Sequence, residues 1–363
     1  MVERHYITKS FFMKFRLPLV LSIALFFITL PSKAQFIQTT VSKPSKVTDG
    51  KYYGESVNNV PEGKGRVEYN DGSVFEGTFH KGLKEGKGLM TWPNGASYEG
   101  DYFKNFRHGK GTYKFSNGNV YTGDLSYNLF EGQGTMTYTD GKTYTGAWKN
   151  DKYQGFGKLT FADKSYYEGE FVLGKRNGKG KYVGLNGTVV ETIWMNDVEH
   201  GPGTQTFANG AVFTGTFVNG QKEGQGKMLF ADSSYYEGNF AGGLYSGQGI
   251  FVFKDKSQYS GNWYFGKRQG QGTLTAANGD SYTGEWNWNQ KNGQGTYKYK
   301  NGDVYIGSFK DDQKHGTGKL TFANGDVYEG SFIYDQRTGQ GKLTKANGTV
   351  IEGEFKNGEL VKK

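Results

Sequence analysis

Tyr98-Glu-Gly-Asp-Tyr-Phe-Lys-Asn-Phe-Arg-His-Gly-Lys-Gly-Thr-Tyr-Lys-Phe-Ser-Asn-Gly-Asn-Val120 is one copy of a 23-residue unit that fills most of this 363-residue chain. Its centre is an aromatic-x-Gly-x-aromatic segment, and Gly-x-Gly begins nine residues after the central glycine. A fixed period in this range predicts a repeat array in which each unit packs on its neighbours. The central glycine recurs every 23 residues, with Thr192 in the one missing place, at Gly54, Gly77, Gly100, Gly123, Gly146, Gly169, Gly215, Gly238, Gly261, Gly284, Gly307, Gly330 and Gly353.

The composition favours strands joined by turns. Glycine accounts for 58 residues and aromatic residues for 16% of the chain. Glycine recurs too often for a long helix to persist. The chain has no cysteine, which excludes disulfides, Cys-ligated metals and a thiol nucleophile.

Each unit reads as a β-hairpin. Tyr328, Gly330 and Phe332 alternate with period two and share one face of a strand. We expect a turn ending in Gly339-Gln-Gly341, then a second strand, then a tight Asn-Gly or Asp-Gly turn that accepts positive φ, as at Asn324-Gly325. The predicted fold is therefore all-β: an elongated single-layer antiparallel sheet of 13–14 in-register 23-residue hairpins.

The glycine in mid-strand needs an explanation of its own, because glycine weakens a strand. It marks a close approach, and we expect an aromatic ring from a neighbouring strand to lie over it. Two columns of rings along one face would then replace the core of a two-layer fold. At two strands per unit and ~4.8 Å between strands, each unit advances by ~9.6 Å.

These residues resemble the MORN (membrane occupation and recognition nexus) repeat. Tyr98-Glu-Gly-Asp-Tyr102, His108-Gly-Lys-Gly111 and Asn117-Gly118 match its pattern, and the resemblance covers about residues 52–357. It implies an elongated, often curved β-sheet that acts as a scaffold or membrane-associated module, with lipid binding attributed to parts of the family. Some members carry a phosphatidylinositol-phosphate kinase domain, for which this sequence leaves no room. The unit centred on Thr192 departs most from the pattern, and we expect a bend there.

The N-terminal region has the pattern of a secretory signal. Basic residues precede the apolar stretch Leu17–Leu30, and Ser32-Lys-Ala34 places small residues at −3 and −1 of a cleavage site. We predict a signal peptide over 1–34, a linker over 35–50 and the repeat array over 51–363. Residues 17–30 as an uncleaved membrane anchor are the alternative, although ~20 apolar residues are needed to cross a bilayer. Cleavage lowers the net charge from +9 to about +5, which does not favour nucleic acid as a partner.

The repeat contains groups that imitate catalytic sites. His108, His200 and His315 lie four and five units apart, too far to share a metal. The recurring glutamates before the central glycine have equivalent surroundings, whereas acid–base chemistry needs two unlike carboxyls. We expect these glutamates to pair with lysines such as Lys87, Lys158, Lys181 and Lys319 on the next strand. We predict no catalytic residue, no metal site and no cofactor.

One surface pattern suggests binding. A basic residue stands seven positions after the central residue in eight units: Lys84, Arg107, Arg176, Lys222, Arg268, Lys291, Lys314 and Arg337. We interpret it as a basic turn edge for anionic lipid or acidic glycan, with solubility and edge protection as the alternative. Aromatic residues outside the two columns also suit an interface, or a packed loop: Phe103, Tyr127, Tyr264, Trp288 and Tyr334.

The sequence thus favours a secreted or periplasmic, non-enzymatic scaffold that docks protein, anionic lipid or glycan at the cell envelope. Two alternatives stay open. One is an envelope enzyme acting on glycan, which would need a unit that breaks the pattern with clustered carboxylates. The other is an organiser tethered to the membrane by residues 17–30. The oligomeric state is left open.

Overall fold

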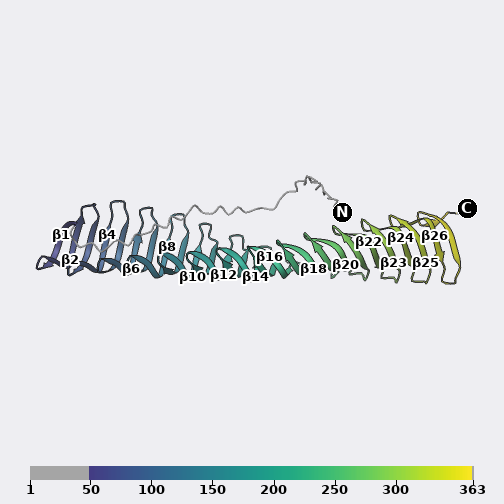
Figure 1. Ribbon diagram of the computed structural model, residues 1–363, viewed down its shortest axis with the longest axis horizontal. Helices are drawn as coiled ribbons and strands as arrows, with labels where there is room; N and C mark the ends of the chain where they lie inside the picture. Colours follow the sequence, from purple (N-terminus) through teal and green to yellow (C-terminus); the bar gives the residue numbers. More distant parts are fainter. Residues whose placement is uncertain (1–48, 362–363) are drawn as a thin grey trace, which may run out of the picture. The chain divides into compact units, whose positions relative to one another are not determined.

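The computed structural model describes residues 49–361, and the predicted signal peptide and most of the linker lie outside this range. The described part is all-β: 28 antiparallel strands form one open sheet, in which each strand pairs with the next along the chain. Figure 1 shows the hairpins following one another in chain order. The predicted all-β, single-layer array of hairpins is confirmed.

The odd-numbered strands carry the aromatic-x-Gly-x-aromatic segment. They are β1 (Gly50–Val57), β3 (Val74–His80), β5 (Ser97–Phe103), β7 (Val120–Ser126), β9 (Thr143–Lys149), β11 (Tyr166–Val172), β13 (Val189–Met195), β15 (Val212–Val218), β17 (Tyr235–Ala241), β19 (Gln258–Tyr264), β21 (Ser281–Asn287), β23 (Val304–Lys310), β25 (Val327–Ile333) and β27 (Val350–Lys356).

The even-numbered strands carry Gly-x-Gly. They are β2 (Val60–Tyr69), β4 (Leu83–Thr91), β6 (Phe106–Lys114), β8 (Leu129–Thr137), β10 (Lys152–Thr160), β12 (Lys175–Val183), β14 (Val198–Thr206), β16 (Gln221–Leu229), β18 (Leu244–Val252), β20 (Lys267–Thr275), β22 (Gln290–Lys298), β24 (Gln313–Thr321), β26 (Gln336–Thr344) and β28 (Glu359–Leu360).

The turns differ from the sequence expectation. The two-residue turns with positive φ at both positions join odd to even strands, as at Lys104 (φ 47°) and Asn105 (φ 74°), which is the geometry that suits the twist of a hairpin. The Asn-Gly and Asp-Gly segments lie in longer loops, closed by a hydrogen bond from the Phe322 amide to the Asp326 carbonyl, and only the glycine has positive φ. Gly-x-Gly lies inside a strand rather than at the end of a turn, and its first glycine takes positive φ at an irregularity in the pairing.

A row of glycines crosses the sheet perpendicular to the strands. Gly111 pairs with Gly100 on one side and Gly123 on the other, and the same register holds along the array. The ring of Tyr98 lies over this row: a Cβ added to Gly111 would come closer than 3.0 Å to the ring and its hydroxyl. A ring does lie over the mid-strand Gly100, but it is that of Tyr98 on the same strand, whereas we expected one from a neighbouring strand. The Tyr98 ring also covers Gly111 on the next strand, which explains why two facing positions both need glycine.

Each ring is held in place at both ends. The Tyr98 hydroxyl donates to the carbonyl of Asp101 at 3.0 Å, and nine other first-column tyrosines make the same bond to the residue three positions on. The ring also meets second-column rings edge-on, as Phe75 does with Phe79 at 5.2 Å and Tyr102 at 5.0 Å. The buried core of this one-layer sheet is therefore two interlocked columns of rings on one face, the ring face.

Thr192 is tolerated because its unit lacks the ring. Val190 stands in the first column there, so the space above the row is free for the Thr192 side chain, whose hydroxyl donates to the Pro202 carbonyl at 3.1 Å. The strand register continues through this unit. The buried core is divided at the same place, with one cluster ending at Trp194 and the next beginning at Phe213.

We predict that Gly111→Ala destabilises the array because the new methyl overlaps the Tyr98 ring. Overpacking of this kind costs about 1–3 kcal/mol, measurable as a lower thermal midpoint. The double variant Gly111→Ala/Tyr98→Val removes the ring from the space that the new methyl would occupy, so it should lose less than the sum of the two single changes. Strict additivity of the two losses would contradict the overlap.

Candidate functional site

The eight basic residues predicted to form a turn edge lie on the ring face instead. Each is the second residue of an even strand, and its charged group lies 5.2–5.8 Å from the centroid of the first-column ring of its own unit, as Arg176 does over Tyr167. Several contact a second ring more closely, such as Arg176 over Trp194 at 4.2 Å. These cations cap the core through cation–π contacts.

Aromatic residues replace the cation in three units. Phe130, Tyr153 and Tyr245 occupy the same position and stack flat on the first-column ring, with centroids 3.6–3.8 Å apart. In the unit where Val190 replaces that ring, the position is Glu199. The Tyr52 unit has Pro61 at this position. In the other units with a first-column ring, the position covers that ring with a cation or with another ring, and this accounts for the basic pattern by packing.

The arginine caps also join neighbouring hairpins. The Arg176 guanidinium donates to the carbonyl of Asp197 in the next two-residue turn at 2.7 Å, and its backbone N–H donates to the Asp197 carboxylate at 2.9 Å. Arg107 and Asn128 repeat both bonds. These contacts tie each turn to the next and hold the turns in one line along the sheet, which we call the turn edge.

We predict that a ring can substitute for a capping cation. Arg176→Tyr, which copies Tyr153, should keep the thermal midpoint near that of the original chain. Arg176→Ser should lower the stability by about 1–2 kcal/mol because it removes both the ring contact and the hydrogen bonds. Equal losses from Tyr and Ser would show that the position does not act as a ring cap.

Lys84 offers a test by pH. Burial lowers its pKa to about 8 from 10.5, helped by the nearby charge of Arg107. The unfolded chain keeps this proton to higher pH, so Lys84 makes the unfolding free energy rise with pH between about 8 and 10.5. NMR titration of the Lys84 side chain should give a midpoint near 8, and a midpoint above 10 would contradict its burial.

The turn edge itself exposes apolar side chains and lysines. Its outward positions are the last residue of the odd strand, the first turn residue and the first residue of the even strand. Fourteen large apolar residues at these positions are exposed: Val57, Val60, Tyr127, Val172, Leu173, Met195, Val198, Val218, Leu244, Tyr264, Phe265, Trp288, Ile333 and Tyr334. Eight exposed lysines share the same positions: Lys81, Lys104, Lys149, Lys152, Lys175, Lys267, Lys310 and Lys356.

The opposite edge has a different character. Its Asn-Gly and Asp-Gly loops expose one large apolar residue among the described loops, Leu185, and they include eight aspartates, from Asp71 to Asp326. At the outward positions of the turn edge the acidic residues are Asp311 and Glu359. The sheet therefore has one basic, apolar edge and one polar edge, whose loops carry six lysines as well as the eight aspartates.

The extra aromatic residues take two kinds of position. Phe103 is half-buried against His108, with ring centroids 5.7 Å apart, and Tyr127 packs on the same histidine at 5.0 Å. Tyr264 and Trp288 project from the turn edge and are 53% and 56% exposed. The expectation of an interface thus suits Tyr264, Trp288 and Tyr334 better than Phe103, which packs within its loop.

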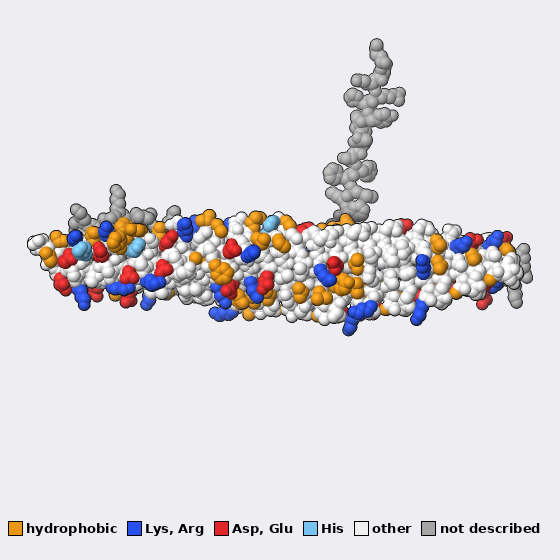
Figure 2. Space-filling view, turned by 90° about the horizontal axis from the view of Figure 1, so that it is seen from below, with side chains coloured by type: hydrophobic (Ala, Val, Ile, Leu, Met, Phe, Trp, Pro, Cys, Tyr) orange, Lys and Arg blue, Asp and Glu red, His pale blue; other side chains and the backbone are white. Residues whose placement is uncertain are grey.

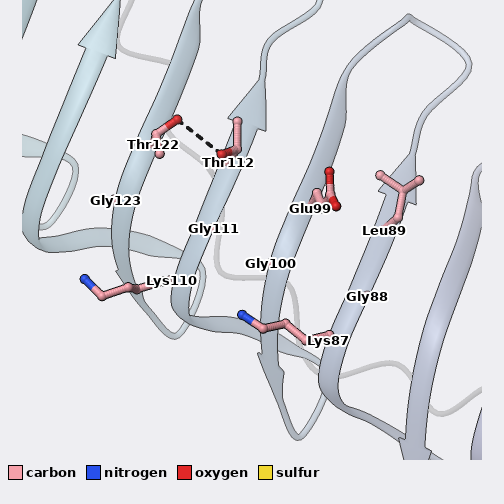
Figure 3. A pocket seen from close by; sticks show the side chains of 10 residues that line it. All are labelled: Lys87, Gly88, Leu89, Glu99, Gly100, Lys110, Gly111, Thr112, Thr122 and Gly123. Atoms are coloured by element: carbon pink, nitrogen blue, oxygen red, sulfur yellow. Dashed lines mark hydrogen bonds between the residues drawn. The ribbon is translucent and has the colours of Figure 1, made fainter.

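The face opposite the rings carries a shallow groove. The glycine row forms its floor, and in Figure 3 Lys87 and Lys110 stand on one side of Gly88 and Gly111. The other side in Figure 3 is lined by Leu89, Glu99, Thr112 and Thr122. This hollow measures about 800 Å³, and related hollows lie beside Gly65 and Gly180. On the surface in Figure 2, uncharged side chains and backbone cover most of the area, and basic groups lie beside acidic ones.

The carboxylates of this face are mostly paired. Lys181 and Lys319 meet Glu191 and Glu329 on the next strand at 2.7 and 3.2 Å, as expected. Lys87 pairs with Asp101 instead, and Lys158 lies over the Tyr166 ring at 4.1 Å. In residues 49–361 there is no group of three or more His, Cys, Asp or Glu that could hold a metal ion.

The histidines act in packing rather than in a shared site. His108 contacts the rings of Phe103 and Tyr127, and its Nδ1 is buried without a hydrogen-bond partner, as is that of His200. At the same position in other units, a Glu or Gln oxygen accepts the N–H of the next turn, as Glu131 does from Asn150 at 3.0 Å.

Within the described chain, no helix is long and apolar enough to cross a membrane.

These features define a class: a single-sheet β-hairpin repeat array whose core is a ladder of rings over glycines. The MORN repeat family matches thirteen segments of the chain, at residues 52–74, 75–97, 98–120, 121–143, 144–166, 167–189, 193–212, 213–235, 236–258, 259–281, 282–304, 305–327 and 328–350. The chain belongs to the MORN repeat family, and the gap in the match falls on Val190–Thr192, where the ring and the glycine are replaced. Such repeats serve as scaffold or binding modules.

Comparisons with curated proteins and with solved structures give no further indication of the function. No curated protein matches the chain. The TCP domain of SAS-4 from Drosophila melanogaster, solved with a proline-rich motif of Ana2, is 13% identical over 49% of this chain and 90% of its own, with a TM-score of 0.29. The TCP10 domain of CPAP from Danio rerio is 12% identical over 80% of this chain and 99% of its own, with a TM-score of 0.17. Virginiamycin B lyase from Staphylococcus aureus is 9% identical over 85% of this chain and 89% of its own, with a TM-score of 0.12. Scores this low do not indicate a shared arrangement.

Proposed function

We propose that this chain is a non-catalytic docking scaffold of the cell envelope, which lies against an anionic lipid surface along its turn edge. The observation that carries the proposal is the difference between the two edges: exposed apolar side chains gather on the turn edge, where eight lysines outnumber two acidic residues, whereas the loops of the other edge hold six lysines and eight aspartates. The N-terminal segment 1–34, with its signal-like pattern, supports an envelope location, secreted or periplasmic.

Three consecutive turns form the most compact part of this surface. Lys149 and Lys152 flank the turn between β9 and β10, and Leu173 and Lys175 belong to the next one. Met195 and Val198, both exposed, follow on the third turn. Apolar side chains flanked by lysines suit the boundary between acyl chains and anionic headgroups. Strand twist turns the edge by roughly 45° per hairpin, so neighbouring turns act together better than distant ones.

The capping cations have a supporting part in this proposal. Lys84, Arg107, Arg176, Lys222, Arg268, Lys291, Lys314 and Arg337 follow directly after the outward positions and add to the positive potential of the edge. Because they cover rings, their removal would weaken the array itself. A binding test therefore has to change the free lysines and leave the caps intact.

We predict that residues 35–363 co-sediment with vesicles containing anionic lipid and that salt weakens this binding. Lys149→Gln/Lys152→Gln/Lys175→Gln should reduce the binding by roughly 100-fold, at about 1 kcal/mol for each lysine near the surface. The matched control, Lys164→Gln/Lys254→Gln/Lys256→Gln, removes the same charge from the opposite edge and should keep at least a third of the original affinity. Equal losses in the two variants, or no binding to anionic vesicles, would refute docking by the turn edge.

A further inference from the structure

The polar face changes character along the array, and one stretch of it is free of ion pairs. Lys227–Glu237 and Lys319–Glu329, at 3.0 and 3.2 Å, bound this stretch at its two ends. Between them, the described positions that line the glycine row carry a single charged side chain, Glu285, which accepts the N–H of Gln294. The N-terminal half has ion pairs such as Lys110–Asp124 in the equivalent places.

Primary amides form one wall of this stretch. Gln248 donates to Asn262 across the strand pair, Gln271 follows at the same position one hairpin later, and Gln294 donates to the Ser308 hydroxyl at 2.8 Å. The three glutamines are exposed. Each amide has two N–H donors and an acceptor oxygen, so one internal bond fixes the group and leaves further bonds for a ligand.

Hydroxyl groups and two exposed isoleucines, Ile250 and Ile306, form the other wall, and glycines form the floor. Thr273 and Thr283 face each other with their hydroxyl oxygens 3.0 Å apart, and Ser260 lies opposite Ile250. Gly249, Gly261 and Gly272 continue the glycine row in the same register as the glycines under the hollow in Figure 3, and the two walls stand on either side of this row.

An exposed ring completes the arrangement. Tyr264 follows Asn262 by two residues and therefore projects from the same face, with 53% of its surface exposed. An exposed tyrosine ring gives a sugar ring an apolar surface against which to stack and a hydroxyl with which to bond. Neutral amides, hydroxyls and an aromatic surface in one shallow groove match an uncharged, hydroxyl-rich polymer better than a charged one.

We infer that the groove over Gln248–Ser308 binds a neutral, β-1,4-linked polysaccharide of N-acetylated amino sugars, which lies along the glycine row and crosses the strands. The acetamido group offers one N–H and one carbonyl, the complement of a glutamine side chain. The amides recur once per hairpin, every ~9.6 Å, which is close to the length of one disaccharide. This site is separate from the lipid-docking turns of the proposed function.

The test is calorimetry with the hexamer of N-acetylglucosamine on residues 35–363. We expect saturable binding that weakens at least tenfold in Gln248→Ala/Gln271→Ala/Gln294→Ala, which leaves the turn edge unchanged. The matched control, Gln133→Ala, removes the same amide from the charged half of the groove and should bind like the original chain. Thermal midpoints of both variants serve to exclude unfolding.

Three results would overturn the inference: no binding of the hexamer, equal weakening by the control, or binding of a sulfated polysaccharide but not of the neutral hexamer. The triple variant should keep its affinity for anionic vesicles. A failure in calorimetry with intact vesicle binding would refute the glycan site alone, whereas the reverse would refute the lipid-docking turns alone.

Discussion

The ring of each first-column tyrosine over a pair of glycines is the contact on which the rest of this array depends. It explains why both facing positions lack a side chain, and why the tyrosine hydroxyl reaches the backbone carbonyl three residues on. It also confines the core to one face. The opposite face takes no part in the core, so the groove whose floor is the glycine row stays open there.

The contact between each tyrosine ring and its glycines also determines the role of the polar residues around the ring. A ring on an open sheet has one side exposed to water, and in the units from Phe75 onward the position that covers the ring takes a cation, a phenylalanine or a tyrosine. In the unit that has Val190 instead of a ring, the covering position is Glu199. Charges that have no ring to cover, such as Lys149 and Lys175, are the ones available for a partner.

Much of this fold could be predicted from the sequence, because the 23-residue period, the alternation around Gly330 and the ring columns all follow from local pattern. The turn types could not, since Asn324-Gly325 has the composition of a tight hairpin turn but lies in a longer loop, while Lys104-Asn105 forms the two-residue turn. The role of Arg176 could not be predicted from the sequence either. Its place after a turn is visible in the sequence, but the direction of its side chain depends on a ring nine residues earlier. The eight basic residues are thus a real pattern whose first cause is packing.

The surfaces on which the functional proposals rest were identified from the exposure of their side chains in the structure and not from a sequence motif. Leu173 and Val198 attract no notice in a sequence with many apolar residues, and only their exposure on one edge sets them apart. The uncharged groove of the C-terminal half is similar, because Gln271 and Thr273 fit the repeat pattern as well as any other polar pair. Sequence periodicity identifies the positions that build the array, whereas the residues free to bind are those that the array does not use.

The most direct test of this division is hydrogen–deuterium exchange of residues 35–363 with and without anionic vesicles. The account predicts slower exchange at the two-residue turns near Leu173 and Asn196 when vesicles are present, with the Asn-Gly and Asp-Gly loops unchanged. Protection at those loops, or along the ring face, would contradict it, since the partner would then bind the residues that the array uses for its own packing.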